Sequence, residues 1–264
     1  MAFATGEPRT SGARQVGMGM NSISLVSVYS VYNNQAASAF IERPSIGFYY
    51  SPVFVGQGVN NISSVMAFPA KKAGTFGLSF GYFGYDAFNE KKLGLSYAIK
   101  LAKFMSIGMQ LDWLNTQIVG YGSKNAATFE LGILAKPLKE LSIAAHIYNP
   151  VKIYLDDANT EKVPTVLKFG ATYEAVKKFF VSIELEQQFG EKMRFRAGFD
   201  YTYKEIISFR GGVSTDPPIG TAGVGVNLKQ GLHIDFATSY SQVLGFQPHV
   251  GIWYELKKRK KIPK

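Results

Sequence analysis

The stretch MRFRAGFDYTYK, residues 193–204, alternates along its whole length between two kinds of side chain. One set is apolar and comprises Met193, Phe195, Ala197, Phe199, Tyr201 and Tyr203. The other set is polar, charged or glycine and comprises Arg194, Arg196, Gly198, Asp200, Thr202 and Lys204. Successive side chains of a β-strand point to opposite faces, so a period of two residues indicates a strand. The stretch therefore predicts a strand with one apolar face and one polar face.

The same alternation recurs along most of the chain after residue 44, and helical periodicity is hardly visible. We place strands at 45–54, 61–70, 74–84, 91–101, 104–118, 125–136, 140–149, 164–176, 178–189, 191–204, 206–215, 220–229, 231–243 and 247–257. Most connections between them are short, as is typical of neighbouring antiparallel strands. About fourteen strands in this order predict an up-and-down meander.

The composition excludes several classes of protein. The chain has 264 residues, of which 46% are hydrophobic and 18% are charged, and it contains no cysteine. A disordered chain would have far fewer apolar residues, and a disulfide-bonded scaffold needs cysteine. No run of the sequence approaches the roughly 18 consecutive apolar residues of a transmembrane helix. Soluble domains average about 25% charged residues, so the low charge needs an explanation.

Two all-β architectures remain, a soluble sandwich or small barrel and a membrane barrel. A sheet of about fourteen strands closes into a barrel too wide for its own side chains to fill. One face of the predicted strands carries Leu, Ile, Val, Phe and Tyr, whereas the other carries Gly, Ala, Ser, Thr and charged residues. The second face cannot form an apolar core, but it suits a polar lumen. We therefore expect an all-β, transmembrane antiparallel barrel in a bacterial outer membrane.

Charged residues on the polar face are predicted to pair across neighbouring strands. Residues that face each other in a hairpin lie at equal distances along the chain from the centre of the turn. A turn near Gly190 places Glu186 opposite Arg194. The same turn places Glu184 opposite Arg196. Turns near Glu205 and Pro137 predict two further pairs, Asp200 with Arg210 and Glu130 with His146. These lumen ion pairs either hold the inner wall together or orient a permeant or a plug.

The N-terminal residues do not alternate in this way and form a separate segment. We divide the chain into a plug at 1–43, a barrel at 44–257 and a basic periplasmic tail at 258–264. The predicted connections on both rims are short, so only the N-terminal segment remains to close a barrel of this width. Ala2-Phe3-Ala4 has the small-x-small form of a signal cleavage site. The numbering therefore starts either in the remnant of an export signal or in an ordinary polar N-terminus.

Most of the positive charge behind the net charge of +10 lies in the tail and in every second turn between the predicted strands. In a meander, every second turn lies at the same end of the barrel. With an even number of strands and both termini in the periplasm, these turns lie on the periplasmic rim. The rim residues that we single out are Lys71, Lys72, Lys177, Lys178, Lys257, Lys258, Arg259 and Lys260. This rim either meets anionic lipid headgroups or docks an acidic partner. Lipid-facing strands argue against nucleic acid as the target of the basic charge.

No arrangement of residues predicts catalysis, a cofactor or a metal site. A turn near Gly245 would place Ser241 across from His249, but Asp235 would then lie about 20 Å away along the strand. A Ser-His-Asp triad needs all three side chains within hydrogen-bond reach. The sequence holds three scattered histidines and no glycine-rich phosphate loop followed by a helix. We therefore expect a protein that is not an enzyme.

Two motifs in the N-terminal segment resemble the signature of the FadL/PorV superfamily of outer-membrane barrels. They are Gly12-Ala13-Arg14-Gln15-Val16-Gly17-Met18-Gly19 and Asn34-Gln35-Ala36, the latter standing where the family usually has Asn-Pro-Ala. Two further stretches, Phe48-Tyr49-Tyr50-Ser51-Pro52 and Ile147-Tyr148-Asn149-Pro150, are similar to Bacteroidota members of the PorV/PorQ kind. The resemblance implies that the N-terminal segment folds into the lumen as a plug. The plug residues that it implies are Gly12, Arg14, Gly17, Gly19, Asn34, Gln35 and Ala36.

The resemblance implies two functions. FadL-like members take up hydrophobic molecules through an apolar pocket around the plug. PorV-like members are accessory barrels of the type IX secretion machine or of related envelope complexes. The small, polar and ion-paired lumen face is a poor surface for an acyl chain, so we expect an accessory subunit with protein partners in outer-membrane lipid. The alternative is a FadL-like channel for small hydrophobic compounds.

Overall fold

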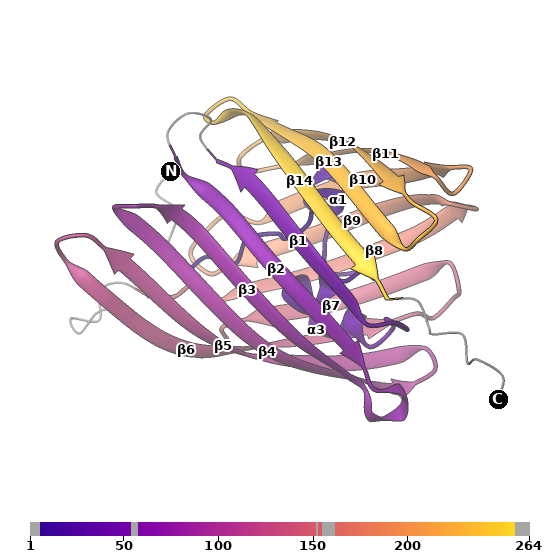
Figure 1. Ribbon diagram of the computed structural model, residues 1–264, viewed down its shortest axis with the longest axis horizontal. Helices are drawn as coiled ribbons and strands as arrows, with labels where there is room; N and C mark the ends of the chain where they lie inside the picture. Colours follow the sequence, from indigo (N-terminus) through magenta and orange to yellow (C-terminus); the bar gives the residue numbers. More distant parts are fainter. Residues whose placement is uncertain (1–5, 54–57, 152, 155–161, 257–264) are drawn as a thin grey trace.

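The computed structural model describes residues 6–53, 58–151, 153–154 and 162–256, and the chain forms a closed antiparallel barrel (Figure 1). In this part of the chain the strands are β1 (Ser45–Pro52), β2 (Asn60–Pro69), β3 (Thr75–Tyr85), β4 (Phe88–Ala102), β5 (Met105–Ile118), β6 (Gly122–Ala135), β7 (Leu141–Tyr148), β8 (Val166–Val176), β9 (Phe179–Gln188), β10 (Arg194–Tyr203), β11 (Ile207–Ser214), β12 (Ile219–Asn227), β13 (Leu232–Ser241) and β14 (Gly245–Glu255). Each strand pairs with its neighbours in sequence, and β1 pairs with β14 to close the barrel. All the strands expected from the alternation are present, which confirms the predicted meander.

The two faces of the wall differ in the way that the alternation predicts. The outer face exposes large apolar side chains such as Phe48, Leu95 and Phe169. The inner face carries polar and charged side chains such as Glu184 and Asp235, which are buried within the lumen. A wall that is apolar outside and polar inside is the arrangement of a transmembrane barrel, because the lipid contacts only the outer face. The predicted fold class is confirmed.

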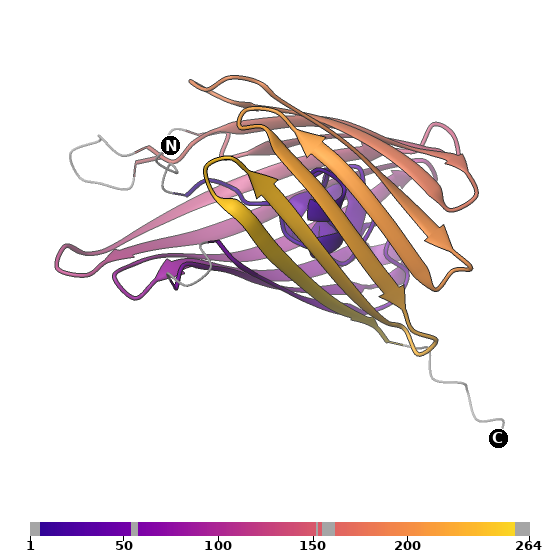
Figure 2. The ribbon, with the colours of Figure 1, turned by 90° about the horizontal axis from the view of Figure 1, so that it is seen from above.

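The described N-terminal residues, 6–43, lie inside the barrel, and we call them the plug. They contain three short helices, α1 (Ala13–Gly17), α2 (Ser30–Asn33) and α3 (Gln35–Ser38). Figure 2 shows these helices enclosed by the ring of strands. None of the helices in the described ranges, which also include the 3-10 turn η1 (Lys71–Ala73), is long and apolar enough to cross a membrane.

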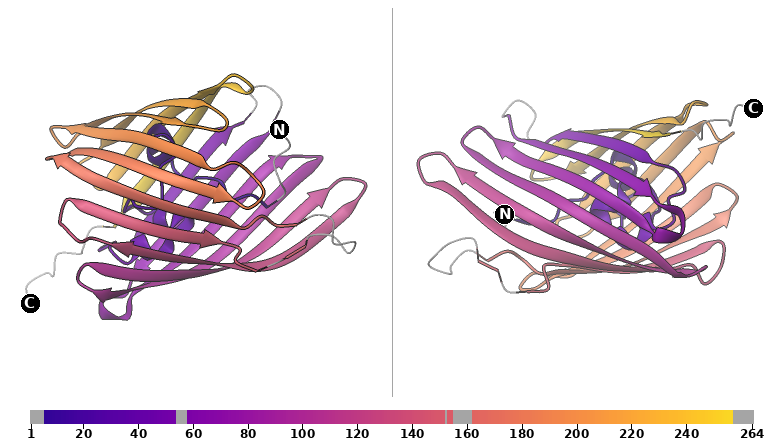
Figure 3. Two further views of the ribbon diagram at one scale, coloured as in Figure 1. Left: turned by 180° about the vertical axis from the view of Figure 1, so that it is seen from behind. Right: turned by 60° about the horizontal axis from the view of Figure 1, so that its bottom comes forward.

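The start of the plug and the end of β14 lie at opposite rims of the barrel (Figure 3). Ser45 at the start of β1 stands opposite Glu255 at the end of β14, and we call this end of the barrel the basic rim. The backbone N–H of Gly6 donates to Glu90 near the start of β4, at the other end, which we call the far rim. The expectation that both termini share one rim is therefore wrong for the described residues. The plug runs through the lumen from the far rim to the basic rim before β1 begins.

Some sequence-based expectations fall on residues that the structure does not describe. The cleavage-like Ala2-Phe3-Ala4 is one of them. The tail is the other, and it includes Lys257, Lys258, Arg259 and Lys260. The turn lysines Lys71, Lys72, Lys177 and Lys178 are described, and they lie in the β2–β3 and β8–β9 connections at the basic rim.

Candidate functional site

A network of ion pairs between β9 and β10 lies beside the plug. Arg196 stands opposite Glu184, and Arg194 stands opposite Glu186, which is the register expected from the sequence. The Arg196 guanidinium lies 2.9 Å from Glu184 and 2.8 Å from Glu186. Arg194 and Lys168 also bind Glu186, at 3.0 and 2.9 Å. Lys168 is not among the residues singled out from the sequence, although the alternation along its strand places it on the face that points into the lumen.

A second network joins β10, β11 and β13 to the plug. Asp200 stands opposite Arg210, as expected, and accepts from the Arg210 Nε at 3.2 Å. Arg14 of the plug motif donates to the same carboxylate at 2.8 Å. Arg210 also reaches Asp235 at 2.6 Å. Asp200 is therefore shared between the wall and the plug, and this shared role was not visible in strand periodicity.

The predicted register of the β6–β7 hairpin is wrong by two residues. Glu130 stands opposite Tyr148, whereas His146 stands opposite Gly132. The cause is the connection 136–140, whose centre lies beyond the Pro137 position assumed from the sequence. The His146 Nε2 nevertheless contacts the Glu130 carboxylate diagonally at 2.9 Å.

Glu130 is the centre of a third buried cluster that also holds the plug. Lys92 of β4 pairs closely with Glu130 and lies 3.6 Å from Asp112 of β5. Gln35 of the plug donates to Glu130 at 2.8 Å. Four neighbouring strands, β4 to β7, thus supply ionisable groups around one plug side chain. A charge buried this deeply is stable only when it is paired and hydrogen-bonded. The hydrogen bond from Gln35 of the plug therefore helps to stabilise the Glu130 carboxylate.

The structure also corrects the hairpin that had aligned Ser241 with His249. Ser241 stands opposite Gly245, because the turn precedes Gly245 instead of centring on it. His249 contacts Ser239 Oγ through Nε2 at 2.9 Å and Tyr49 OH through Nδ1 at 2.8 Å. In the described ranges, no three His, Asp or Glu side chains gather so that they could hold a metal ion.

The glycines of the first plug motif are required by close packing. Gly12 has a φ of 104°, and a Cβ there would lie 2.8 Å from the Tyr29 ring. Gly17 packs against Gly223 of β12, where a Cβ on Gly17 would lie 3.4 Å from the Gly223 Cα. Gly19 has a φ of 72°, which favours glycine. Each motif glycine therefore marks either a backbone conformation or a contact that a side chain would block.

The second plug motif departs from the family pattern at Gln35, and the structure shows what replaces the proline. Asn34 caps α3, because its side chain accepts from the Ala36 N–H at 3.2 Å. Its amide also donates to Ile23 O at 2.8 Å. The turn is thus set by Asn34. Gln35 is free to bind Glu130 of the wall, which a proline could not do.

A set of wall glycines faces the plug and lets its backbone approach the strands. A Cβ built on any of them would come within 3.0 Å of a plug atom. They are Gly47, Gly77, Gly81, Gly108, Gly132, Gly198 and Gly212. We call them the seat glycines. Such contacts leave no room for another side chain, so the seat glycines specify a close fit between this plug and this wall.

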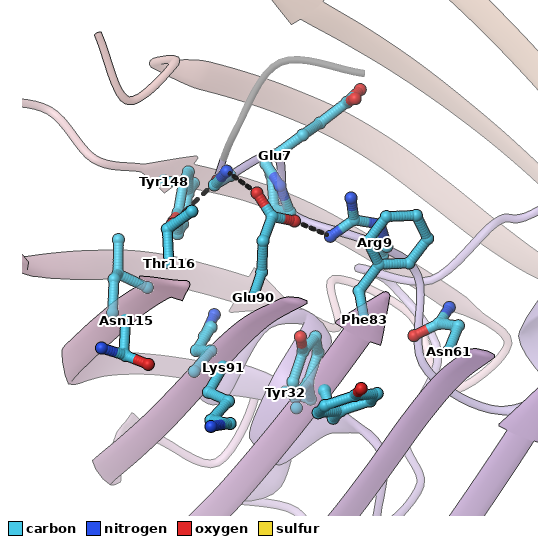
Figure 4. Close-up of a pocket in the computed structure, with 16 residues that line it drawn as sticks. Glu7, Arg9, Tyr32, Asn61, Phe83, Glu90, Lys91, Asn115, Thr116 and Tyr148 are labelled. Atoms are coloured by element: carbon cyan, nitrogen blue, oxygen red, sulfur yellow. Dashed lines mark hydrogen bonds and ion pairs between the residues drawn. The ribbon is translucent and has the colours of Figure 1, made fainter. Parts of the chain in front are cut away.

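Residues 6–10 of the plug, which we call the strap, tie the far end of the lumen together (Figure 4). Glu90 of β4 accepts from Gly6 N at 2.7 Å and pairs with Arg9 at 2.8 Å. The Tyr148 OH of β7 donates to Gly6 O at 3.0 Å. Glu7 pairs with Arg194 of β10 at 3.0 Å. The strap is therefore held at three separate places on the wall.

Replacing Glu90 with alanine is expected to release one end of the strap. The change removes two hydrogen bonds to a charged carboxylate, each of which contributes about 1.5–3 kcal/mol. Amide hydrogen exchange in residues 6–10 should therefore become at least about tenfold faster. Glu174→Ala, at the basic rim, is the matched control and should leave exchange in the strap unchanged. Unaltered strap exchange in Glu90→Ala would contradict the anchoring role.

A cavity of about 430 Å³ lies between the plug and the far rim. The lining is mixed. Its charged side chains include Glu186, Arg194 and Arg196. Its apolar side chains come from the plug, from β12 and from far-rim connections and include Val16, Met20, Val53, Ile219, Val243 and Leu244. The strap borders it on one side. A second pocket of about 30 Å³, which Figure 4 shows, also borders the strap and lies beside Tyr32 and Tyr148. The first volume lies within the usual range for small-molecule sites.

Many polar side chains around the larger cavity already have partners. Tyr49 and His249 bind each other, and the Gln247 amide donates to Val53 O at 2.6 Å. Arg194 is paired with two carboxylates. An apolar guest would therefore leave these particular groups as well bonded as before, and the cost of burying an unpaired polar group would not arise for them.

Comparison with known proteins identifies the fold. No protein-family model and no curated protein sequence matches the chain. Among solved structures, the toluene transporter TbuX of Ralstonia pickettii matches with a TM-score of 0.74 at 12% identity, covering 95% of this chain and 99% of that one. The toluene transporter TodX of P. putida gives 0.73 at 10% identity, covering 96% and 100%. A FadL homologue of Pseudomonas aeruginosa gives 0.69 at 12% identity, covering 97% and 99%.

The chain has the FadL-type barrel fold. At these identities the likeness concerns the fold alone. The fold implied by the resemblance to FadL is therefore confirmed, whereas membership of the FadL or the PorV branch stays a prediction. In this FadL-type barrel the lumen is occupied by the plug, and the described cavity lies between the plug and the far rim.

Proposed function

We propose that this FadL-type barrel is a non-enzymatic outer-membrane channel that admits small hydrophobic compounds into the cavity above its plug. The observation that carries the proposal is that cavity of about 430 Å³, whose lining includes a group of apolar side chains and in which several of the polar side chains are already paired. Two solved barrels with this fold are described as toluene transporters, which supports the same class of ligand.

The expectation of an accessory subunit in a secretion or envelope complex is the second candidate. It rested on a polar, ion-paired lumen that would suit an acyl chain poorly. Glu186, Arg194 and Arg196 line the cavity but are paired with one another, and other charged groups contact the plug, as Arg14 with Asp200 and Gln35 with Glu130 illustrate. The polar lumen therefore weighs less against a hydrophobic ligand than the sequence suggested, and the channel becomes the better supported proposal.

Replacing Ile219 with glutamate is expected to weaken binding of a hydrophobic probe. Ile219 lies at the start of β12 and lines the cavity, so a carboxylate there would have to lose water when toluene enters. Toluene binding to the purified barrel in amphipol, followed by saturation-transfer NMR, should fall by at least about tenfold, which corresponds to about 1.4 kcal/mol. Ile219→Leu keeps an apolar side chain and should bind toluene as the wild type does.

The same preparation separates the two candidates. Equal toluene binding by Ile219→Glu and wild type would contradict the proposed cavity. No toluene binding by the wild type, together with stoichiometric protein bands after purification in mild detergent, would favour the accessory subunit.

A further inference from the structure

Two lysines at the basic rim converge on the last aromatic side chain of the plug. Lys100 near the end of β4 and Lys136 just after β6 place their ammonium groups 4.6 and 4.3 Å from the centre of the Phe40 ring. Phe40 packs at the edge of an apolar cluster inside the barrel that includes Ala37 and Leu134. Both lysines are therefore directed into the mouth of the barrel and away from the surrounding lipid.

Neither ammonium group has a carboxylate partner in the described part of the chain. Partial burial, and secondarily the charge of Lys100, lower the pKa of Lys136 below its usual range. The Phe40 ring offers each cation a favourable face, but it supplies no negative charge. The mouth thus holds two like charges whose repulsion an incoming anion would relieve.

The neighbouring turns extend this positive charge around the basic rim. Described lysines in the turns of this rim are Lys71, Lys72, Lys103, Lys139, Lys177, Lys178, Lys204 and Lys229. Of the acidic residues at the same rim, Glu255 is paired with Arg43 at 3.8 Å and Glu205 with Lys178 at 3.7 Å. These pairs lie away from the β4–β5 and β6–β7 turns. Glu42 follows Phe40 by two residues and Glu140 shares the β6–β7 turn with Lys136, but in the described residues no ion pair joins either carboxylate to Lys100 or Lys136.

We propose that the Lys100–Phe40–Lys136 mouth docks an acidic segment of a periplasmic protein. Charge complementarity requires an anionic occupant, and the inward direction of the two lysines favours a partner that approaches along the barrel axis over headgroups around its circumference. An extended peptide can bring several carboxylates into a mouth of this kind at once. The occupant would contact Phe40 and hence the end of the plug. The basic rim is taken as periplasmic because it carries the short turns and both ends of the sheet.

The test uses a fluorescein-labelled hexaglutamate peptide and the full chain in nanodiscs of zwitterionic phosphatidylcholine. Fluorescence anisotropy at low salt should show saturable binding to the wild type, which high salt should abolish because it screens the charges. The K100Q/K136Q variant should bind at least about tenfold more weakly. The control K177Q/K178Q removes the same charge from another turn of the rim and should change affinity less than about twofold.

Two further variants show that a loss of binding is specific. K100R/K136R keeps both charges and should bind the peptide like the wild type, and its migration in gels before and after heating shows that the barrel is folded. Ile219→Glu should also bind the peptide normally, so this test is independent of the proposed channel. Equal losses in K100Q/K136Q and K177Q/K178Q, or no binding at low salt, would overturn the proposal. Complete loss of wild-type peptide binding in nanodiscs that contain phosphatidylglycerol would assign the lysines to lipid instead.

Discussion

Gly212→Val should unseat the plug and turn a closed barrel into a conducting one. A Cβ on Gly212 would overlap the backbone N of Gly19 and lie 2.5 Å from the carbonyl carbon of Met18. Backbone atoms cannot rotate away as a flexible side chain can, so the plug has to move as a unit. Overpacking of this kind costs about 1–3 kcal/mol, and we expect the upper end of that range. Planar-bilayer recordings should show persistent ionic current in the variant and none in the wild type.

Gly220→Val provides the matched control for this prediction. Gly220 lies on β12, next to β11, but nothing lies within 4 Å of a Cβ built there. The substitution adds the same side chain to the same sheet without touching the plug. It should leave both conductance and thermal stability close to wild type. Two results would show that the plug is not seated as described. One is ionic current through Gly220→Val, and the other is no current through Gly212→Val together with an unchanged melting temperature.

Arg196→Ala is expected to have the largest effect on stability among the lumen charges. Arg196 binds Glu184 and Glu186 and also donates to Met20 O of the plug at 3.2 Å. Removing one partner of a buried ion pair costs about 3–5 kcal/mol. We expect about 3 kcal/mol, because Glu184 keeps hydrogen bonds from two plug amides, those of Ser22 and Ile23. Reversible urea unfolding in lipid vesicles measures the change.

Arg194→Ala is the control on the same strand. Arg194 also pairs with Glu186, but its side chain is 23% exposed, compared with 7% for Arg196. Solvent screens the more exposed pair, so its loss should cost only about 1 kcal/mol or less. Similar losses in the two variants would mean that water reaches both sites equally and that Arg196 does not anchor the plug.

Together these expectations describe a lumen in which wall and plug complete each other. Glu184 binds the backbone of the plug, Asp200 binds Arg14, and Glu130 binds Gln35. The sequence left open whether the lumen ion pairs only hold the wall together or also orient a plug. These contacts support the second alternative. The cavity near the far rim is then the site that we propose for a ligand, and the basic rim the surface that we propose for a partner.

The residues of the strands were predictable because a strand's pattern is local. Alternate residues of the 193–204 stretch face the lipid and the lumen. Because the lipid is apolar and the lumen is polar, the two faces can be told apart from the residue types in the sequence. The same locality explains why the Glu184–Arg196 and Asp200–Arg210 registers agree with a tight turn. Where the connection is longer or begins elsewhere, as at 136–140 and before Gly245, the register shifts and the prediction fails.

By itself, the sequence of this protein determined the barrel, its apolar outer face, its charged lumen and the basic turns, because these depend on neighbours only one or two residues apart. Only the tertiary structure decided that the plug threads the lumen from one rim to the other, that Asp200 and Glu130 are shared with it, and that Lys100 and Lys136 meet over Phe40. Those contacts join residues far apart in the chain and carry no periodic signal. Their positions follow from closure of the barrel around the plug, which no local pattern records.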